Sequence, residues 1–220
     1  MDKLNFERAR HNMVEQQIRT WDVFDERVLD LMLEVPREDF VPQALRSLAF
    51  NDMAVPLGHG EAMMQPKVEA RMLQALNVHP ADTILEIGTG SGYVTALLAR
   101  LGQHVFSVDL HADFVESAGT RFASHGIDDV TLDTGDAARG WGRRGTFDII
   151  AVTGSLPELT GDIRKDLNIG GRMFAVIGRE PVMEACLITR LGRDDWQKEA
   201  LFETVVPPLA NAPESHHFVL

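Results

Sequence analysis

The sequence predicts an α/β fold with a doubly wound, mostly parallel sheet. From residue 83 onward, short apolar segments alternate with segments of helical periodicity, and the first apolar segment runs into a cluster of glycines. Strands that alternate with helices form parallel sheets with right-handed crossovers. The chain has 220 residues, enough to bury a full core. We therefore expect a single domain over 1–220, with a helical N-terminal cover over 1–80 and a Rossmann-like core over 81–220.

Composition and charge exclude several classes of protein. Lys and Arg number 21 against 33 Asp and Glu, a net charge of −12, so we expect no nucleic-acid partner, which would need a basic face. No window approaches ~20 apolar residues and the first residues are polar, so we expect no membrane span, no secretory signal and a cytoplasmic setting. The lone Cys186 allows no intrachain disulfide and is expected in the core, and the eight histidines show no metal-ligand spacing.

The N-terminal part carries helix signals. Asp25 can cap a helix whose apolar residues lie within 28–32, and Pro36 ends it because the residue before a proline avoids the helical region. Pro66 suits the first turn of a second helix. The core strands are expected at 83–87, 104–109, 130–132 and 147–152, with helices at 91–101 and 112–124. Three further strands, at 172–177, 185–191 and 200–206, are separated by hairpin-length gaps and predict antiparallel edge strands.

The segment Leu85–Gly92, which reads Leu-Glu-Ile-Gly-Thr-Gly-Ser-Gly, follows a strand and opens a helix. Glycines there permit positive φ and close approach of the backbone to a ligand. Asp109 ends the next strand, 21 residues after Gly88. A carboxylate at that offset can accept hydrogen bonds from both ribose hydroxyls of a nucleotide. The alternative is a tight strand-to-helix turn that binds nothing.

The spacing of the glycines favours S-adenosylmethionine over a dinucleotide. The dinucleotide fingerprint is Gly-x-Gly-x-x-Gly, whereas this chain has Gly-x-Gly-x-Gly with Tyr93 at the position of the third glycine. Glu86 stands two residues before the loop, where a carboxylate suits a cationic ligand better than a pyrophosphate. Asp136 follows the third strand and can accept a hydrogen bond from an adenine amino group, or serve only as a turn residue. The predicted cofactor-binding residues are Glu86, Gly88, Thr89, Gly90, Ser91, Gly92, Asp109, Leu110, Gly135, Asp136 and Ala137.

These motifs belong to a longer pattern that resembles the protein-L-isoaspartate (D-aspartate) O-methyltransferases. The pattern includes Val35–Pro42, which reads Val-Pro-Arg-Glu-Asp-Phe-Val-Pro, then Gln65-Pro66, the glycine loop and Gly170–Arg172. The resemblance covers nearly the whole chain. It implies a class I methyltransferase sheet and the transfer of a methyl group from S-adenosylmethionine, with S-adenosylhomocysteine as product. The implied acceptor is the α-carboxylate of an isoaspartyl residue in a damaged protein, a protein-repair reaction.

The chain departs from the family's pattern at one place. The segment that is typically Gly-Gln-Thr-Ile-Ser-Gln-Pro, whose Thr and Ser lie at the active site, is here Gly60–Pro66 with Glu61, Ala62 and Met64 at the Gln, Thr and Ser positions. The resemblance thus places Ala62, Met64 and Thr153 at the acceptor site, with Thr153 as the nearest side-chain donor or only a strand cap. Two alternatives stay open: a methyltransferase of altered substrate, and a cofactor-binding relative with little activity.

Three further side chains carry weaker signals. Trp21 is expected to pack in the core, although it could cover the cleft. His59, between two glycines, could touch a ligand or be an ordinary loop residue. The pair His216-His217 is expected to be solvated rather than to hold a metal.

Overall fold

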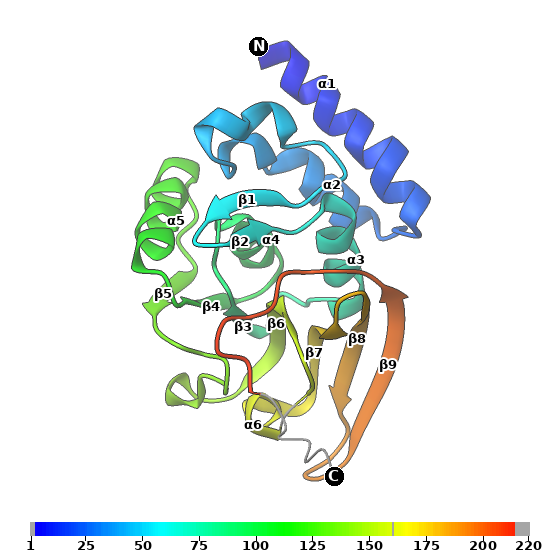
Figure 1. Cartoon of the computed structure of the whole chain (residues 1–220), viewed down its shortest axis with the longest axis vertical. Helices are drawn as coiled ribbons and strands as arrows, with labels where there is room; N and C mark the ends of the chain where they lie inside the picture. Colours follow the sequence, from blue (N-terminus) through cyan, green and yellow to red (C-terminus); the bar gives the residue numbers. More distant parts are fainter. Residues whose placement is uncertain (1–2, 160, 214–220) are drawn as a thin grey trace.

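The computed structural model describes residues 3–159 and 161–213, and its centre is a seven-stranded sheet (Figure 1). The strands are β3 (Thr83–Ile87), β4 (His104–Asp109), β5 (Val130–Thr134), β6 (Phe147–Leu156), β7 (Leu167–Arg179), β8 (Val182–Arg190) and β9 (Trp196–Glu203). Their order is β5-β4-β3-β6-β7-β8-β9. The strands β5, β4, β3, β6 and β7 each pair in parallel with the next in this order. Strand β8 is antiparallel to both of its neighbours. The predicted parallel sheet with antiparallel strands at its C-terminal edge is confirmed.

The strand order reverses beside β3. From β3 the chain crosses to β4 and β5 on one side, then to β6 and β7 on the other. Such a reversal leaves a crevice at the carboxyl ends of the strands, which is where open α/β sheets bind ligands. The glycine loop follows β3 and Asp109 ends β4, so both lie at this crevice.

Two apolar clusters form the core, one on each face of the sheet, because successive strand residues point to opposite faces. The larger contains Ile84 of β3 and packs against the N-terminal helices and the helices that follow β3 and β4. The smaller contains the neighbouring Leu85 and packs around Trp141 and Ile163. Cys186 is fully buried in the smaller cluster, as expected.

Several helices pack against the sheet, and the first two lie at the end of the molecule where the N-terminus is marked (Figure 1). The helices are α1 (Lys3–Met13), which continues as a π-helix (Val14–Ile18) and a 3-10 turn (Arg19–Trp21), α2 (Glu26–Glu34), α3 (Pro66–Leu76), α4 (Tyr93–Leu101), α5 (Ala112–His125) and α6 (Gly161–Arg164), with further 3-10 turns at Arg37–Asp39, Gln43–Leu48 and Gly142–Arg144. Asp25 caps α2 by accepting a hydrogen bond from the backbone of Arg27, and Pro66 opens α3, both as predicted. None of the helices in the described part of the chain has the length and apolar character that a bilayer crossing requires.

The prediction that residues 1–80 are helical is wrong at one place. A two-stranded hairpin, β1 (Val55–Gly58) and β2 (Glu61–Met63), lies above the carboxyl edge of the sheet. Gly58 and Gly60 adopt φ of 117° and 84° at its turn, a conformation that other residues rarely take. The hairpin is too short for its alternation to be read from the sequence.

Trp21 does not pack in the core. It is 37% exposed, and the ammonium nitrogen of Lys67 lies 3.9 Å from the centre of its ring. Nor does it line the cleft described below. The favoured expectation for Trp21 is therefore wrong, because the ring lies at the surface and packs against the ammonium group of Lys67.

A buried arginine joins the N-terminal cover to the hairpin. Arg37 is fully buried and donates to the carbonyl of Ala49 (2.8 Å), to the carbonyl of Met64 (2.7 Å) and to the carboxylate of Glu69. Its guanidinium also lies 4.9 Å from the ring centre of Tyr93. The planar fork of five donors suits this role, because one side chain can serve acceptors on several segments at once.

Candidate active site

The glycine loop turns sharply between β3 and α4. Gly88, Gly90 and Gly92 adopt φ of 101°, 50° and 80°. A Cβ at Gly88 would overlap the hydroxyl oxygen of Thr153, so only glycine fits there. Thr153 donates to the carbonyls of Ile87 (3.0 Å) and Gly88 (2.7 Å), which ties β6 to the loop. The hydroxyl proton of Thr153 is thus engaged within the protein and is not free for a substrate carboxylate.

Glu86 lies beneath this loop rather than in the cleft. It is fully buried, and its carboxylate accepts hydrogen bonds from Thr95 and from Ser107 (2.6 Å). Ser107 in turn shares a 2.6 Å hydrogen bond with Thr89 of the loop. Burial raises the pKa of Glu86 to about 8, although both hydrogen bonds lower it. Glu86 therefore supports the loop from below, and it does not face a cationic ligand as the sequence suggested.

Asp109 lines the cleft with its carboxylate held by backbone amides. One carboxylate oxygen accepts from the backbone N–H of Gly90 (2.8 Å) and the other from that of His111 (2.9 Å). Each carboxylate oxygen has a second lone pair, so both remain able to accept from a ligand hydroxyl. Asp109 lines the cleft with its side chain fixed in position by these two amides. This arrangement fits the expected contact with two ribose hydroxyls.

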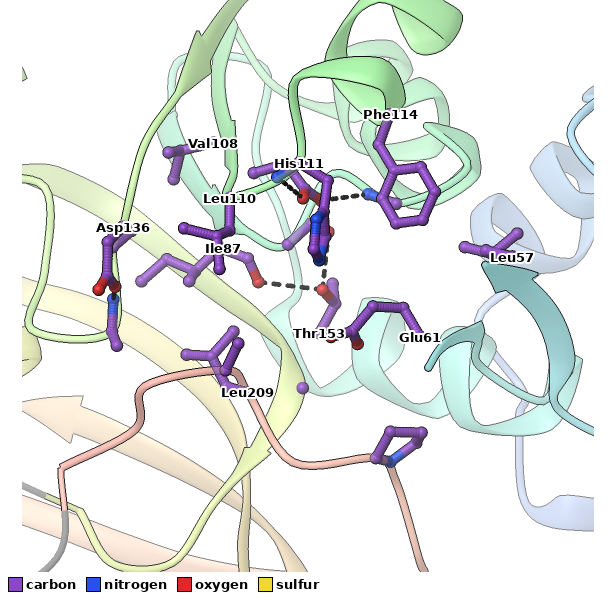
Figure 2. Close-up of a pocket in the computed structure, with 18 of the residues that line it drawn as sticks. Leu57, Glu61, Ile87, Val108, Leu110, His111, Phe114, Asp136, Thr153 and Leu209 are labelled. Carbon is purple, nitrogen blue, oxygen red and sulfur yellow. Dashed lines mark hydrogen bonds between the residues drawn. The ribbon is translucent and has the colours of Figure 1, made fainter. Parts of the chain in front are cut away.

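Asp136 lines the same cleft as Asp109, and Figure 2 shows it on the side of the cleft away from Leu57. Its carboxylate accepts from the backbone N–H of Ala138 and from the side-chain amide of Asn211, each at 3.0 Å. The preceding Gly135 has no room for a side chain, because a Cβ there would meet the ring of Trp141. The wall that carries Asp136 is thus held by the distant Asn211 and by Trp141, which lies six residues after Gly135.

The cleft at these residues has a volume of about 650 Å³ and is open to solvent, and Figure 2 shows its walls. Its lining residues come from the hairpin, the glycine loop, β4, β6 and the segment after β9. They include three carboxylates, those of Glu61, Asp109 and Asp136, and within the described chain no Lys or Arg lines it. Burial raises the pKa of Glu61, and the nearby Asp109 raises it further, whereas His111 and His59 oppose the shift.

A smaller compartment of about 310 Å³ adjoins the cleft between the hairpin and the loop. Ala62 and Thr153 line both compartments, and Met64 lines the smaller one, so the structure brings the predicted acceptor-site residues together against the loop. Met64 is buried, and its carbonyl is held by Arg37. The walls of this compartment combine apolar side chains with the backbone of the loop.

Most of the predicted cofactor residues lie together. Those that line the cleft are Gly88, Gly90, Asp109, Leu110, Gly135, Asp136 and Ala137. Thr89 and Ser91 line the smaller compartment. Gly92 lines neither, because it packs against Ala118 and Phe122, and Glu86 lies below the loop as described. The nine cleft and compartment residues therefore form one continuous surface around the end of β3.

Several lining residues were missed by the sequence analysis. The segment 207–210 crosses the end of β6, where the N–H of Leu209 donates to the carbonyl of Ser155 (2.8 Å). The N–H of Ser155 donates in turn to the carbonyl of Pro207 (2.8 Å). No local pattern after β9 marks these residues. Phe114 and His111 line the opposite wall, and only their place after Asp109 could have suggested this (Figure 2).

The parallel sheet with its reversal at β3 and the glycine loop at the carboxyl end of β3 define a class I, Rossmann-like methyltransferase. A family model described as "Protein-L-isoaspartate(D-aspartate) O-methyltransferase (PCMT)" matches residues 8–211. The chain belongs to the protein-L-isoaspartate (D-aspartate) O-methyltransferase family.

Individual relatives agree with this assignment. The chain is 37% identical over 201 residues to a protein-L-isoaspartate O-methyltransferase of Rhodopseudomonas palustris strain CGA009, covering 91% of this chain and 92% of that protein. It is 37% identical over 198 residues to the enzyme of the same name from Syntrophus aciditrophicus, covering 89% and 91%.

Solved structures show the same fold. A protein-L-isoaspartate O-methyltransferase superimposes with a TM-score of 0.79 at 23% identity, over 92% of this chain and 66% of that one, just under two-thirds of its length. A Plasmodium falciparum protein with the same assigned activity, crystallised with S-adenosyl-L-homocysteine, gives a TM-score of 0.77 at 21% identity, over 91% and 97%.

The Asp109 contact predicts a binding defect. Asp109→Ala removes the acceptor for two ligand hydroxyls, and hydrogen bonds to charged groups contribute ~1.5–3 kcal/mol each, so S-adenosylhomocysteine should bind at least ~10-fold more weakly in calorimetry. Asp129→Ala, which removes an exposed carboxylate beside β5, is the matched control and should bind as the wild type does. Equal affinity in Asp109→Ala and the control would show that Asp109 does not hold the ribose.

The buried Glu86 predicts a pH-dependent stability. With its pKa raised from 4.5 to about 8 in the folded state, the carboxyl is stabilised in its protonated form, so this stability is present at low pH and is lost as pH rises from about 4.5 to about 8. Glu86→Gln keeps an acceptor and a donor without a charge. It should therefore flatten the pH profile of the unfolding free energy by up to ~4 kcal/mol across that window, since one pKa unit corresponds to ~1.4 kcal/mol.

Denaturant titrations between pH 5 and pH 8.5 measure this effect. Glu116→Gln, at an exposed position of α5, is the control and should leave the profile unchanged. Parallel profiles for the wild type and Glu86→Gln would contradict the raised pKa.

Proposed function

We propose that this chain transfers the methyl group of S-adenosylmethionine to the α-carboxylate of L-isoaspartyl residues in damaged proteins. The observation that carries the proposal is the charge of the cleft. Three carboxylates and no Lys or Arg line it within the described residues. This lining suits a ligand with an ammonium, a sulfonium and an adenosine. It would repel the pyrophosphate of a dinucleotide.

The residues present fit that cofactor. Asp109 would accept from the ribose hydroxyls, and Asp136 would accept from the adenine amino group. The loop from Gly88 to Ser91 would hold the amino-acid end against its backbone, where the smaller compartment begins. The apolar side chains of Val108 and Leu110 would cover the adenine. When bound, the cofactor supplies an activated methyl group on a cationic sulfur.

The acceptor chemistry does not call for a catalytic base. A carboxylate with a pKa of ~3.5–4 is ionised at neutral pH, so no proton has to be removed before it attacks. The protein's task is to align the acceptor oxygen with the methyl group and to exclude water. The hairpin above the loop is placed for this role, since Ala62 lies at the junction of the two compartments.

When the acceptor carboxylate enters the site it loses hydrogen bonds to water, and donors of the protein must replace them. Ala62 and Met64 carry no hydroxyl, and Thr153 has committed its proton to the loop. We therefore assign the hydrogen bonds to the acceptor carboxylate to backbone N–H groups of the segments 60–65 and 152–154. The regular pairing of β6 with β7 is interrupted between Ala151 and Ser155, a stretch that includes Thr153 at the junction of the two compartments.

A methyl-transfer assay tests the proposal. The purified chain should methylate a peptide that contains one L-isoaspartyl residue and should leave the matching aspartyl peptide unmethylated. Gly88→Ala is the loss-of-function control, because its Cβ would overlap Thr153 and block the loop conformation. Binding of S-adenosylhomocysteine without transfer to the isoaspartyl peptide would overturn the proposed acceptor and leave the cofactor assignment standing.

Restoring the hydroxyls should increase the rate. In Ala62→Thr with Met64→Ser, one or two recovered hydrogen bonds of ~1–1.5 kcal/mol should raise kcat/KM for the isoaspartyl peptide by ~10-fold or more. The double variant Ala62→Val with Met64→Ala reproduces the size of the new side chains without their hydroxyls and should show no such gain. If both double variants gain equally, space rather than hydrogen bonding limits the reaction.

A further inference from the structure

Two histidines and an aspartate gather at the rim of the cleft, outside the residues assigned above to cofactor and acceptor. His59 lies at the turn of the β1–β2 hairpin, His111 directly precedes α5, and Asp113 lies in the first turn of that helix. The rings of His59 and His111 stack with their centres 4.1 Å apart and their planes 10° apart. The Nε2 atom of His59 lies 2.9 Å from a carboxylate oxygen of Asp113.

The three side chains can offer their ligand atoms to one point. A nitrogen of each ring and a carboxylate oxygen of Asp113 all lie within 4.8 Å of one another, and in the described part of the chain no other group of three such side chains does so. Neighbouring ligands of a tetrahedral zinc ion lie ~3.4 Å apart, given bonds of ~2.0–2.2 Å. The cluster therefore has to contract by roughly 1–1.5 Å at its widest, and the two stacked rings have to turn so that their in-plane lone pairs converge. His59 and Asp113 are exposed and can move.

The surrounding charges favour a cation at this point. The positive end of the α5 dipole opposes it, but by little at an exposed position. Glu61 lies close enough to His111 and to Asp109 that each of them shifts its pKa. Asp113, beside His59, adds a third carboxylate. A divalent ion would therefore enter a region of negative charge, in a chain whose net charge is −12.

We propose that His59, His111 and Asp113 form a binding site for a divalent transition-metal ion, for which zinc is the representative. Two imidazoles and one carboxylate are typical zinc ligands, and an exposed site leaves the fourth position to water. Calcium and magnesium are excluded by their preference for oxygen ligands. The site ties the turn of the hairpin to α5, so an ion there fastens the hairpin over the cleft. The spacing of the histidines in the sequence does not reveal it, because 52 residues separate His59 from His111.

Calorimetry with zinc chloride and the metal-free protein tests the site. The wild type should bind one zinc ion with an affinity that falls ~10-fold or more in His59→Gln and in Asp113→Asn, since even the loss of an outer-shell partner weakens metal sites by ~10- to 100-fold. Zinc should also raise the melting temperature of the wild type and not that of the variants, because it binds the folded state.

Matched variants exclude other sources of binding. His11→Gln removes an exposed histidine on α1, and His216→Gln with His217→Gln removes the adjacent pair that lies outside the described residues. Both should bind zinc as the wild type does. His59→Gln and Asp113→Asn should still bind S-adenosylhomocysteine in the presence of a chelator, which shows that they fold. Unchanged zinc affinity in these two variants, or no stoichiometric binding by the wild type, would overturn the proposal.

Discussion

The buried guanidinium of Arg37 is the interaction on which the arrangement of the site depends. It connects three places within residues 1–80: the carbonyl of Ala49, the carbonyl of Met64 just after the hairpin and the carboxylate of Glu69 in α3. The removal of either member of a buried ion pair leaves an unpaired charge and typically destabilises a protein by ~3–5 kcal/mol. Because the same side chain holds the carbonyl of Met64, the hairpin cannot shift without breaking this network. The stability of the N-terminal cover and the position of the segment that carries Met64 are thus coupled.

A second network holds the cofactor side of the cleft. Glu86 anchors Ser107 and Thr95 below the glycine loop, and Thr153 fastens the loop from β6. Both networks bury polar groups that form hydrogen bonds, which fixes conformation as well as adding stability. The loop is therefore held from below and from the side, and its upper surface is left to face the cleft.

The replacement of two hydroxyls in the acceptor segment is accommodated in this frame. Ala62 and Met64 line the smaller compartment beside the loop, and Arg37 holds the backbone of their segment at the carbonyl of Met64. Loss of the hydroxyls therefore changes the chemistry of the smaller compartment without removing what positions it. The side chain of Met64 adds an apolar surface to this compartment. Glu61 adds a carboxylate to the adjoining cleft.

Local patterns in the sequence were enough to predict the strands of the seven-stranded sheet, most helices, the glycine loop and the carboxylates at the ends of successive strands. These depend on apolar periodicity and on residues a few positions apart. The sequence by itself also favoured S-adenosylmethionine over a dinucleotide as the ligand of the loop, although it based this preference on Glu86. Only the tertiary structure decided that Glu86 is buried below the loop while Glu61 faces the cleft. It alone brought the segment 207–210 to the end of β6 and His59 to His111. Such contacts join residues separated by tens of positions, and their geometry depends on how the whole chain packs, which no local pattern records.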